Sequence, residues 1–219
     1  AYATGITKRE WRAPRETDLT LQPSANLYYK ITPALTGTLT FNTDFSDTPL
    51  DERRVNTGRF ALFYPETRDF FLQDAAIFEF GGTPLFDDPN GSPFFTRNIG
   101  LVSGVPVDIV AGGKLSGALD GLGIGMLTVQ SAGTDTTNGQ LLSVGRFTMP
   151  VLGQSKLGLL FTNGDPTGSR NNTVAGADFQ FRDTKILGGD TIQADFFYEH
   201  SFTSAAPDDD AYGFEVSFP

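Results

Sequence analysis

The sequence predicts an all-β protein in which antiparallel strands follow one another up and down in a meander. Apolar and polar residues alternate with a period of two along most of the chain, which is the spacing of the two faces of a strand. The 219 residues also include 25 glycines and 20 phenylalanines but only 19% charged residues. This composition favours strands and turns over helices, and we expect a single domain over residues 1–219.

The predicted strands are roughly nine or ten residues long, whereas strands in globular proteins usually have about five or six. In the C-terminal half, one face carries Phe179, Phe181, Phe196, Tyr198, Phe214 and Phe218, and the other carries Gln180, Arg182, Asp195, Glu199 and Glu215. Outside the irregular segment described below, the predicted strands are Ala3–Trp11, Ser24–Thr32, Leu35–Phe45, Arg97–Val102, Ile109–Leu119, Leu122–Gln130, Leu141–Met149, Lys156–Asn163, Thr173–Arg182, Ile192–Glu199 and Tyr212–Phe218.

From Ile109 onward, the connections between these strands are alternately short and long. The short ones are Asp120-Gly121, Leu152–Gln154 and Leu187–Asp190, and the long ones are Ala132–Gln140, Gly164–Asn172 and Thr203–Asp210. In a meander this places every short turn at one end and every long loop at the other, which is typical of outer-membrane barrels. A soluble β-sandwich shows this asymmetry less regularly. The sequence therefore predicts a complete or partial outer-membrane-type β-barrel.

An irregular segment of about residues 46–95 interrupts the alternation. It is rich in charge and in phenylalanine, and it is too long to be a simple loop. We predict one helical turn at Glu66–Gln73 and a short strand at Ala76–Phe80 inside it. Because its phenylalanines need apolar cover, we expect the segment to be inserted in the lumen or to cap the barrel.

Composition excludes several classes of function. The net charge of −10 argues against a nucleic-acid binder, which needs a basic surface to neutralise phosphates. The absence of cysteine excludes disulfides, thiolate metal sites and cysteine nucleophiles, and a single histidine, His200, excludes a histidine-rich metal site. No serine elbow accompanies His200. We therefore predict no catalytic residues and no cofactor.

Two groups of charged residues are the candidate sites. The denser group is interpreted as a charge network in the barrel lumen and comprises Asp51, Glu52, Arg53, Arg54, Arg59, Glu66, Arg68 and Asp69. The other group, Asp87, Asp88 and Asn90, places oxygen ligands around a turn and is a candidate calcium site, although it lacks the spacing of an EF-hand. A salt-bridged network without a further role, and solvated acidic loop tips, remain the plain alternatives for these groups.

Several segments of the chain, in order, resemble a bacterial family of unknown function. They are Asn42–Ser46, Asp51–Asn56, Arg59–Glu66, Arg68–Leu72, Phe94–Gly100, Gly112–Gly117 and Phe161–Asp165. Members of that family are large surface proteins in which a carbohydrate-binding family-nine-like module precedes a region that looks like an outer-membrane barrel. The resemblance implies a barrel region and, before it, a carbohydrate-binding module that the 219 residues do not contain. It implies no activity. Thr67, Gln73-Asp74 and Asn98 differ from the family's usual residues.

Three functions stay open on the sequence alone. The first is a non-enzymatic barrel in the bacterial outer membrane, in contact with its lipid, that acts as a channel, a transporter or a surface scaffold linked to glycan handling. The second is a soluble β-sandwich that binds polysaccharide through its aromatic residues. The third is a glycan-processing enzyme, for which no carboxylate pair stands out. The first two differ in whether the apolar strand faces form an outward belt or an inward core.

Overall fold

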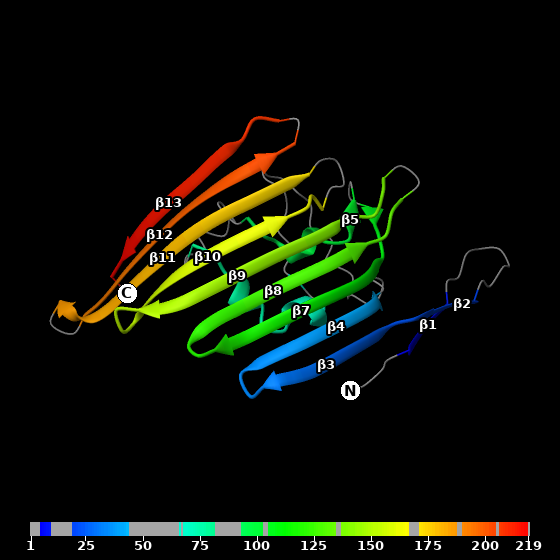
Figure 1. The fold of residues 1–219 in the computed structure, drawn as a ribbon, viewed down its shortest axis with the longest axis horizontal. Helices are drawn as coiled ribbons and strands as arrows, with labels where there is room; N and C mark the ends of the chain where they lie inside the picture. Colours follow the sequence, from blue (N-terminus) through cyan, green and yellow to red (C-terminus); the bar gives the residue numbers. More distant parts are fainter. Residues whose placement is uncertain are drawn as a thin grey trace.

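The computed structural model describes residues 5–9, 19–43, 66, 68–81, 93–102, 105–134, 137–166, 171–187, 190–204 and 206–218. Nine strands of these residues form one antiparallel sheet in the order β13-β12-β11-β10-β9-β8-β7-β4-β3 (Figure 1). Each strand therefore pairs with the one before it in the sheet, and the insertion lies between β4 and β7. The predicted up-and-down meander is confirmed. Within the described part of the chain, the two edge strands β3 and β13 do not pair with each other, so this sheet is open.

The strand boundaries agree with the predicted ones to within a few residues in most cases. The sheet is built from β3 (Ala25–Thr32), β4 (Leu35–Thr43), β7 (Ile109–Leu119), β8 (Leu122–Ser131), β9 (Leu141–Val151), β10 (Ser155–Asn163), β11 (Asn172–Leu187), β12 (Asp190–Thr203) and β13 (Asp209–Ser217). The last four strands have between 9 and 16 residues. A separate hairpin is formed by β1 (Gly5–Arg9) and β2 (Leu19–Pro23).

Two tight turns place consecutive strands in register at the same end of the sheet. Asp120 and Gly121 both have positive φ angles, of 49° and 86°, and join β7 to β8. Leu152 and Gly153, at 50° and 79°, join β9 to β10 in the same way. Positive φ at consecutive turn residues matches the right-handed twist of the flanking strands. The longer connections lie at the opposite end, as the sequence predicts.

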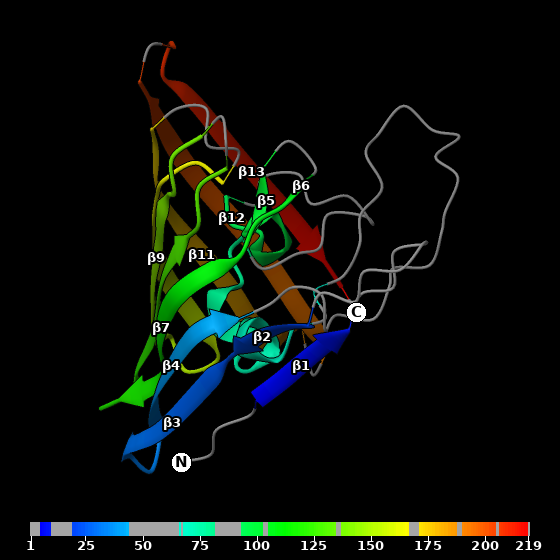
Figure 2. The same ribbon diagram turned by 90° about the vertical axis from the view of Figure 1, so that its right-hand side faces the viewer.

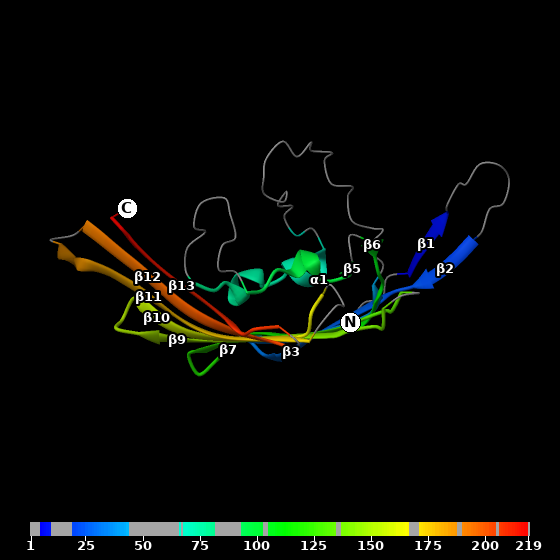
Figure 3. The same ribbon diagram turned by 90° about the horizontal axis from the view of Figure 1, so that it is seen from above.

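The described residues of the insertion between β4 and β7 lie on the concave side of the curved sheet. Figures 2 and 3 show its helical turns on the same side of the strands, with the sheet curving around them. These elements are α1 (Asp69–Leu72), η2 (Ala75–Phe78) and η3 (Thr96–Asn98), together with the small hairpin of β5 (Leu101–Val102) and β6 (Val105–Pro106). No helix in the described residues has the length and the hydropathy needed to cross a membrane.

The helical turn predicted at Glu66–Gln73 is confirmed by α1, but two predicted strands are wrong. The segment Ala76–Phe80 begins as a 3-10 turn, because Asp74 adopts a left-handed conformation and its carbonyl accepts the Ile77 N–H. The segment Arg97–Val102 also begins as a 3-10 turn, and only its last two residues form a strand. The Ile99 carbonyl accepts a hydrogen bond from the Arg68 side chain instead of one from a neighbouring strand.

The main hydrophobic core lies between the concave face and the insertion. Buried side chains from β7 to β10 contact buried phenylalanines of α1 and η2. The cluster comprises Phe70, Phe71, Phe78, Ile99, Ile109, Leu127, Val129, Leu142, Val144 and Leu160, with Ile77, Phe80 and Phe94 packed against it. The insertion is therefore fixed to the inner face of the sheet by apolar contacts.

Candidate functional site

The two faces of the sheet differ sharply in what covers them. The convex outer face carries large apolar side chains that remain exposed along nearly every strand, including Phe214, which is 78% exposed. Others on this face are Leu27, Tyr29, Leu39, Phe41, Met126, Leu157, Leu159, Phe161, Phe196, Tyr198, Tyr212 and Val216. An exposed apolar surface of this extent marks a membrane or protein contact in other proteins.

Cross-strand register makes the outer apolar surface continuous. Leu157 lies opposite Phe179, Phe179 opposite Phe196, and Phe196 opposite Phe214, so one row crosses four strands. A second row contains Phe147, Leu159, Ala177, Tyr198 and Tyr212. The two predicted sets of C-terminal residues therefore lie on opposite faces of the sheet. Asp195 and Glu215 lie opposite each other on the inner face.

Phenylalanine rings of the insertion lie against glycines of the inner face. A Cβ atom added at Gly125 would lie 2.8 Å from Ile77 Cγ2 and 3.0 Å from the Phe78 ring. At Gly176, it would lie 2.7 Å from the Phe80 ring. Each of these glycines thus leaves room that an aromatic side chain of the insertion occupies. Gly112 lies beneath the Phe70 ring in the same way. We call Gly112, Gly125 and Gly176 the glycine seats.

A buried lysine of β7 holds the end of α1. Lys114 Nζ donates hydrogen bonds to the carbonyls of Phe70, at 2.6 Å, and Gln73, at 2.5 Å. These carbonyls stand at the C-terminal end of the turn, where helix carbonyls lack partners within the helix. Ser116 lies two residues after Lys114 in β7, on the same face, and its hydroxyl donates to Asp74 Oδ2 at 2.7 Å. Polar side chains of the sheet therefore fix the insertion as well as apolar ones.

Arg68 joins the two halves of the insertion. Its guanidinium pairs with Glu66 at 2.6 Å and donates to the carbonyls of Ile99, at 2.7 Å, and Thr96, at 2.6 Å. It also lies 4.2 Å from the centre of the Phe71 ring. Burial tends to raise the pKa of Glu66, but hydrogen bonds and charge from Arg68 outweigh it, so that pKa lies below its ordinary value. The same burial lowers the pKa of Arg68.

A second ion pair is completely buried under the insertion. Arg146 of β9 donates to both carboxylate oxygens of Asp178 of β11, at 2.5 and 2.9 Å, and both side chains are at most 1% exposed. Gly158 of β10 lies between them, and any larger side chain there would collide with both. Asp178 also accepts the Gly81 N–H at 3.3 Å, which ties the end of the described insertion to the sheet.

One buried carboxylate of the inner face is only partly satisfied. Asp195 is 4% exposed, and its Oδ2 accepts a hydrogen bond from Gln193 at 2.8 Å, but its Oδ1 has no hydrogen-bond partner. Its direct cross-strand neighbour is Glu215. Like charges placed opposite each other on adjacent strands destabilise the pair. The carboxylates of Asp195 and Glu215 therefore repel each other on the inner face of β12 and β13.

The predicted charge network is described only in part. Glu66 and Arg68 pair with each other, whereas Asp69 is exposed at the start of α1. Asp51, Glu52, Arg53, Arg54 and Arg59 lie outside the described residues, as do the calcium candidates Asp87, Asp88 and Asn90. Within the described residues, no group of three or more histidine, aspartate or glutamate side chains is placed to hold a metal ion.

Sequence reasoning missed the residues of the sheet that hold the insertion. Lys114 and Arg146 are charged residues at inward positions of otherwise apolar or small-residue strand faces. A charge at such a position needs a buried partner, and this signal could have singled them out. Their partners could not be named, since Phe70 and Asp178 are brought to them only by the docking of the insertion and by the register of three strands.

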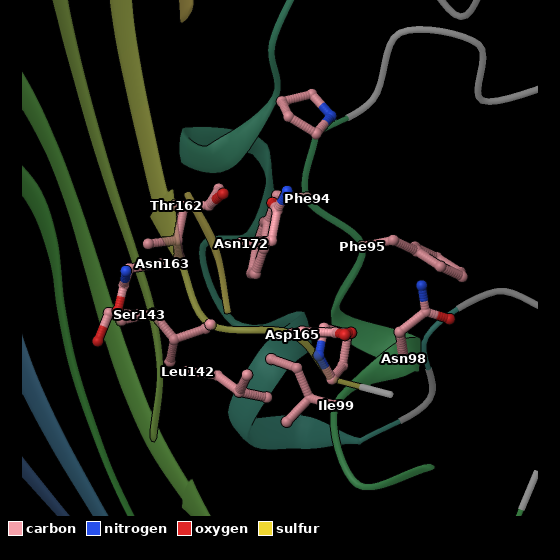
Figure 4. A pocket seen from close by; sticks show the side chains of 15 residues that line it. Phe94, Phe95, Asn98, Ile99, Leu142, Ser143, Thr162, Asn163, Asp165 and Asn172 are labelled. Atoms are coloured by element: carbon pink, nitrogen blue, oxygen red, sulfur yellow. The ribbon is translucent and has the colours of Figure 1, made fainter. Parts of the chain in front are cut away.

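A pocket lies at the end of the sheet that carries the long connections. Its volume is about 200 Å³, and it lies between the inner face of β8 to β10 and residues 93–99 (Figure 4). Leu142 and Ile99 point toward each other across it, while Ser143 and Asn163 point away to the other side of the strands. Polar side chains at the pocket belong to Asn98, Thr162, Asp165 and Asn172.

Comparison with known proteins found no matching family model, no matching curated protein and no matching solved structure.

Proposed function

We propose that this chain forms wall strands of a β-barrel in the bacterial outer membrane, with the insertion in the lumen. In this proposal, the convex face contacts lipid and the concave face lines a lumen narrowed by α1, η2 and η3. The barrel would serve as a channel, a transporter or a surface scaffold. The resemblance to a family of bacterial surface proteins agrees with this placement, and polysaccharide handling by a separate carbohydrate-binding module belongs to the same proposal.

The observation that carries the proposal is the exposed apolar outer face. Rows such as Leu157, Phe179, Phe196 and Phe214 run across neighbouring strands with nothing packed on them in the described residues. In water such a surface would be buried by a second sheet or by helices. The insertion instead packs on the opposite face, where the buried ion pairs lie. Lipid is the environment that this distribution of polarity fits.

Strand length and loop placement support the same proposal. A tilted strand needs about 9–11 residues to cross the apolar part of a bilayer. The strands β7 to β13 have between 9 and 16 residues. Their tight turns lie at one end and their long connections at the other, as in barrels with short periplasmic turns and longer external loops.

Site-specific labelling tests the proposal directly, because the chain has no cysteine. Phe196→Cys on the outer face and Gln180→Cys on the inner face are matched in depth, since Phe196 pairs with Phe179, the residue next to Gln180. With an environment-sensitive fluorophore, we expect nitroxide-labelled lipid to quench the label at position 196 strongly and the label at position 180 weakly.

Two outcomes would contradict the membrane placement. One is purification of the folded protein from the soluble fraction without detergent, which would favour the soluble polysaccharide-binding alternative. The other is equal quenching of the two labels by lipid in reconstituted, heat-modifiable protein, which would show that the outer face does not contact lipid.

A further inference from the structure

We propose that the pocket between β8–β10 and residues 93–99 binds one ring of a neutral saccharide. The inference does not depend on the membrane placement, because the described residues of the pocket lie on the inner side of the sheet. Its size sets the first limit on the ligand. At about 200 Å³ it is smaller than the roughly 300–1,000 Å³ typical of sites for drug-sized ligands, so it suits a single small ring.

The described residues around the pocket favour a neutral ligand over an anionic one. Among them are one carboxylate, Asp165, and no lysine, arginine or histidine. A phosphate or carboxylate group would find no cation among these described residues to pair with, and Asp165 would repel it. Asp165 already takes part in an interaction with its surroundings, so it does not stand ready for a cationic ligand either. A neutral ligand fits this lining best.

One side of the pocket is apolar and firmly held. Leu127, Leu142 and Val144 form its floor from the inner face, and Phe94 and Ile99 form its wall. The Phe94 ring packs on Phe78 of the core, with ring centres 5.8 Å apart. The apolar side is therefore preorganised, as a platform for the C–H face of a sugar ring must be.

The opposite side of the pocket carries the amide groups of Asn98 and Asn172. The Asn98 amide can both donate and accept hydrogen bonds as sugar hydroxyls require, whereas both N–H donors of Asn172 are engaged within the protein. Asn172 is oriented by its own contacts, since its Nδ2 donates to the Ser201 hydroxyl at 2.8 Å and the Thr203 hydroxyl at 2.7 Å. Asn98 stands exposed at the rim. A ring with one apolar face and a polar edge matches a pocket built in this way.

The test is saturation-transfer NMR and calorimetry on the purified full chain, in detergent if it needs detergent. The probes are methyl glycosides of glucose, galactose, mannose, xylose and N-acetylglucosamine. We expect at least one of them to bind, and to bind more tightly than its charged counterparts, glucuronate and glucosamine. Binding of none of the five, or tighter binding of a charged analogue, would overturn the proposal.

Matched variants locate the binding. Asn172→Ala should weaken binding about tenfold, the equivalent of one good hydrogen bond. Asn163→Ala is the matched control, because Asn163 is also a strand-end asparagine whose side chain donates to a threonine, Thr173. It should leave binding unchanged, because the Asn163 side chain points away from the pocket.

Phe94→Leu and Asn98→Ala test the wall and the rim. If Phe94→Leu fails to fold by circular dichroism, Asn98→Ala decides. Undiminished binding in Asn172→Ala and Asn98→Ala would place the ligand elsewhere and refute the site.

Discussion

At the scale of single residues, the exposed outer face gives the sharpest prediction. Phe214→Arg replaces a side chain that is 78% exposed, and such a change in water alters stability by no more than about 0.5 kcal/mol. In lipid near mid-depth it should cost about 2–4 kcal/mol. The next residue, Glu215, faces inward, and Glu215→Arg is the matched control, which we expect to be tolerated beside Asp195. Urea unfolding in lipid vesicles measures the free energy of unfolding of both variants. Equal losses of stability in the two would contradict lipid contact.

For Asp195, the buried carboxylate of β12, we predict a gain in stability on substitution. Asp195→Asn should stabilise the protein by about 0.5–1 kcal/mol, because it removes a like charge opposite Glu215. The amide oxygen can still accept the hydrogen bond from Gln193. Asp190→Asn, at an exposed position where β12 begins, should change stability little. A loss of stability in Asp195→Asn would mean that a cation partner satisfies this carboxylate.

The ion pair of the insertion predicts a dependence on pH. The pKa of Glu66 in the folded protein lies below its ordinary value of 4.5, so its stabilising effect is complete above that value. The effect is lost as the pH falls through the lower, folded-state pKa. We expect the slope of stability against pH below about 4.5 to be shallower in Glu66→Gln than in the native protein. Unfolding curves from neutral pH to about pH 2 would measure this, and identical slopes would contradict it.

At the scale of elements, the glycine seats determine how the insertion meets the sheet. Gly125→Ala and Gly176→Ala should each cost about 1–3 kcal/mol, because a methyl group would push into Ile77, Phe78 or Phe80. Gly145→Ala is the control, since its Cβ would meet only the edge of Phe147, at 3.7 Å on the outer face.

Limited proteolysis would show whether the loss of stability in these variants comes from release of the insertion. Faster cleavage within residues 66–81 is expected in Gly125→Ala and Gly176→Ala but not in Gly145→Ala. Unchanged cleavage in all three would mean that the aromatic rings shift without releasing the segment.

At the scale of the whole molecule, most of the sheet follows from the sequence. Strict alternation identifies β7 to β13 and assigns Phe179 and Gln180 to opposite faces, because a strand's side-chain period is two whatever lies beyond it. Short apolar runs are less informative. Ala76, Phe78 and Phe80 alternate like a strand, yet the left-handed Asp74 starts a helical turn there, and the side chains of Phe78 and Phe80 still reach the sheet.

The candidate site was less predictable than the sheet. The Glu66–Arg68 pair is local in sequence and could be anticipated, whereas Arg146 and Asp178 meet across an intervening strand at Gly158. Such a contact depends on the register of three strands at once. The pocket depends in addition on where residues 93–99 dock. No local pattern contains that information, because it arises from packing between segments far apart in the chain.

The glycine seats also bear on the order of events during synthesis. Phe70, Phe78 and Phe80 leave the ribosome before the strands that receive them, and the seat for Phe80, Gly176, follows about a hundred residues later. Until β11 has joined the sheet, the aromatic rings of the insertion have no complete surface to occupy. Docking of the insertion is thus complete only after β11 has joined the sheet, and until then the nascent chain carries the Phe80 ring without its seat.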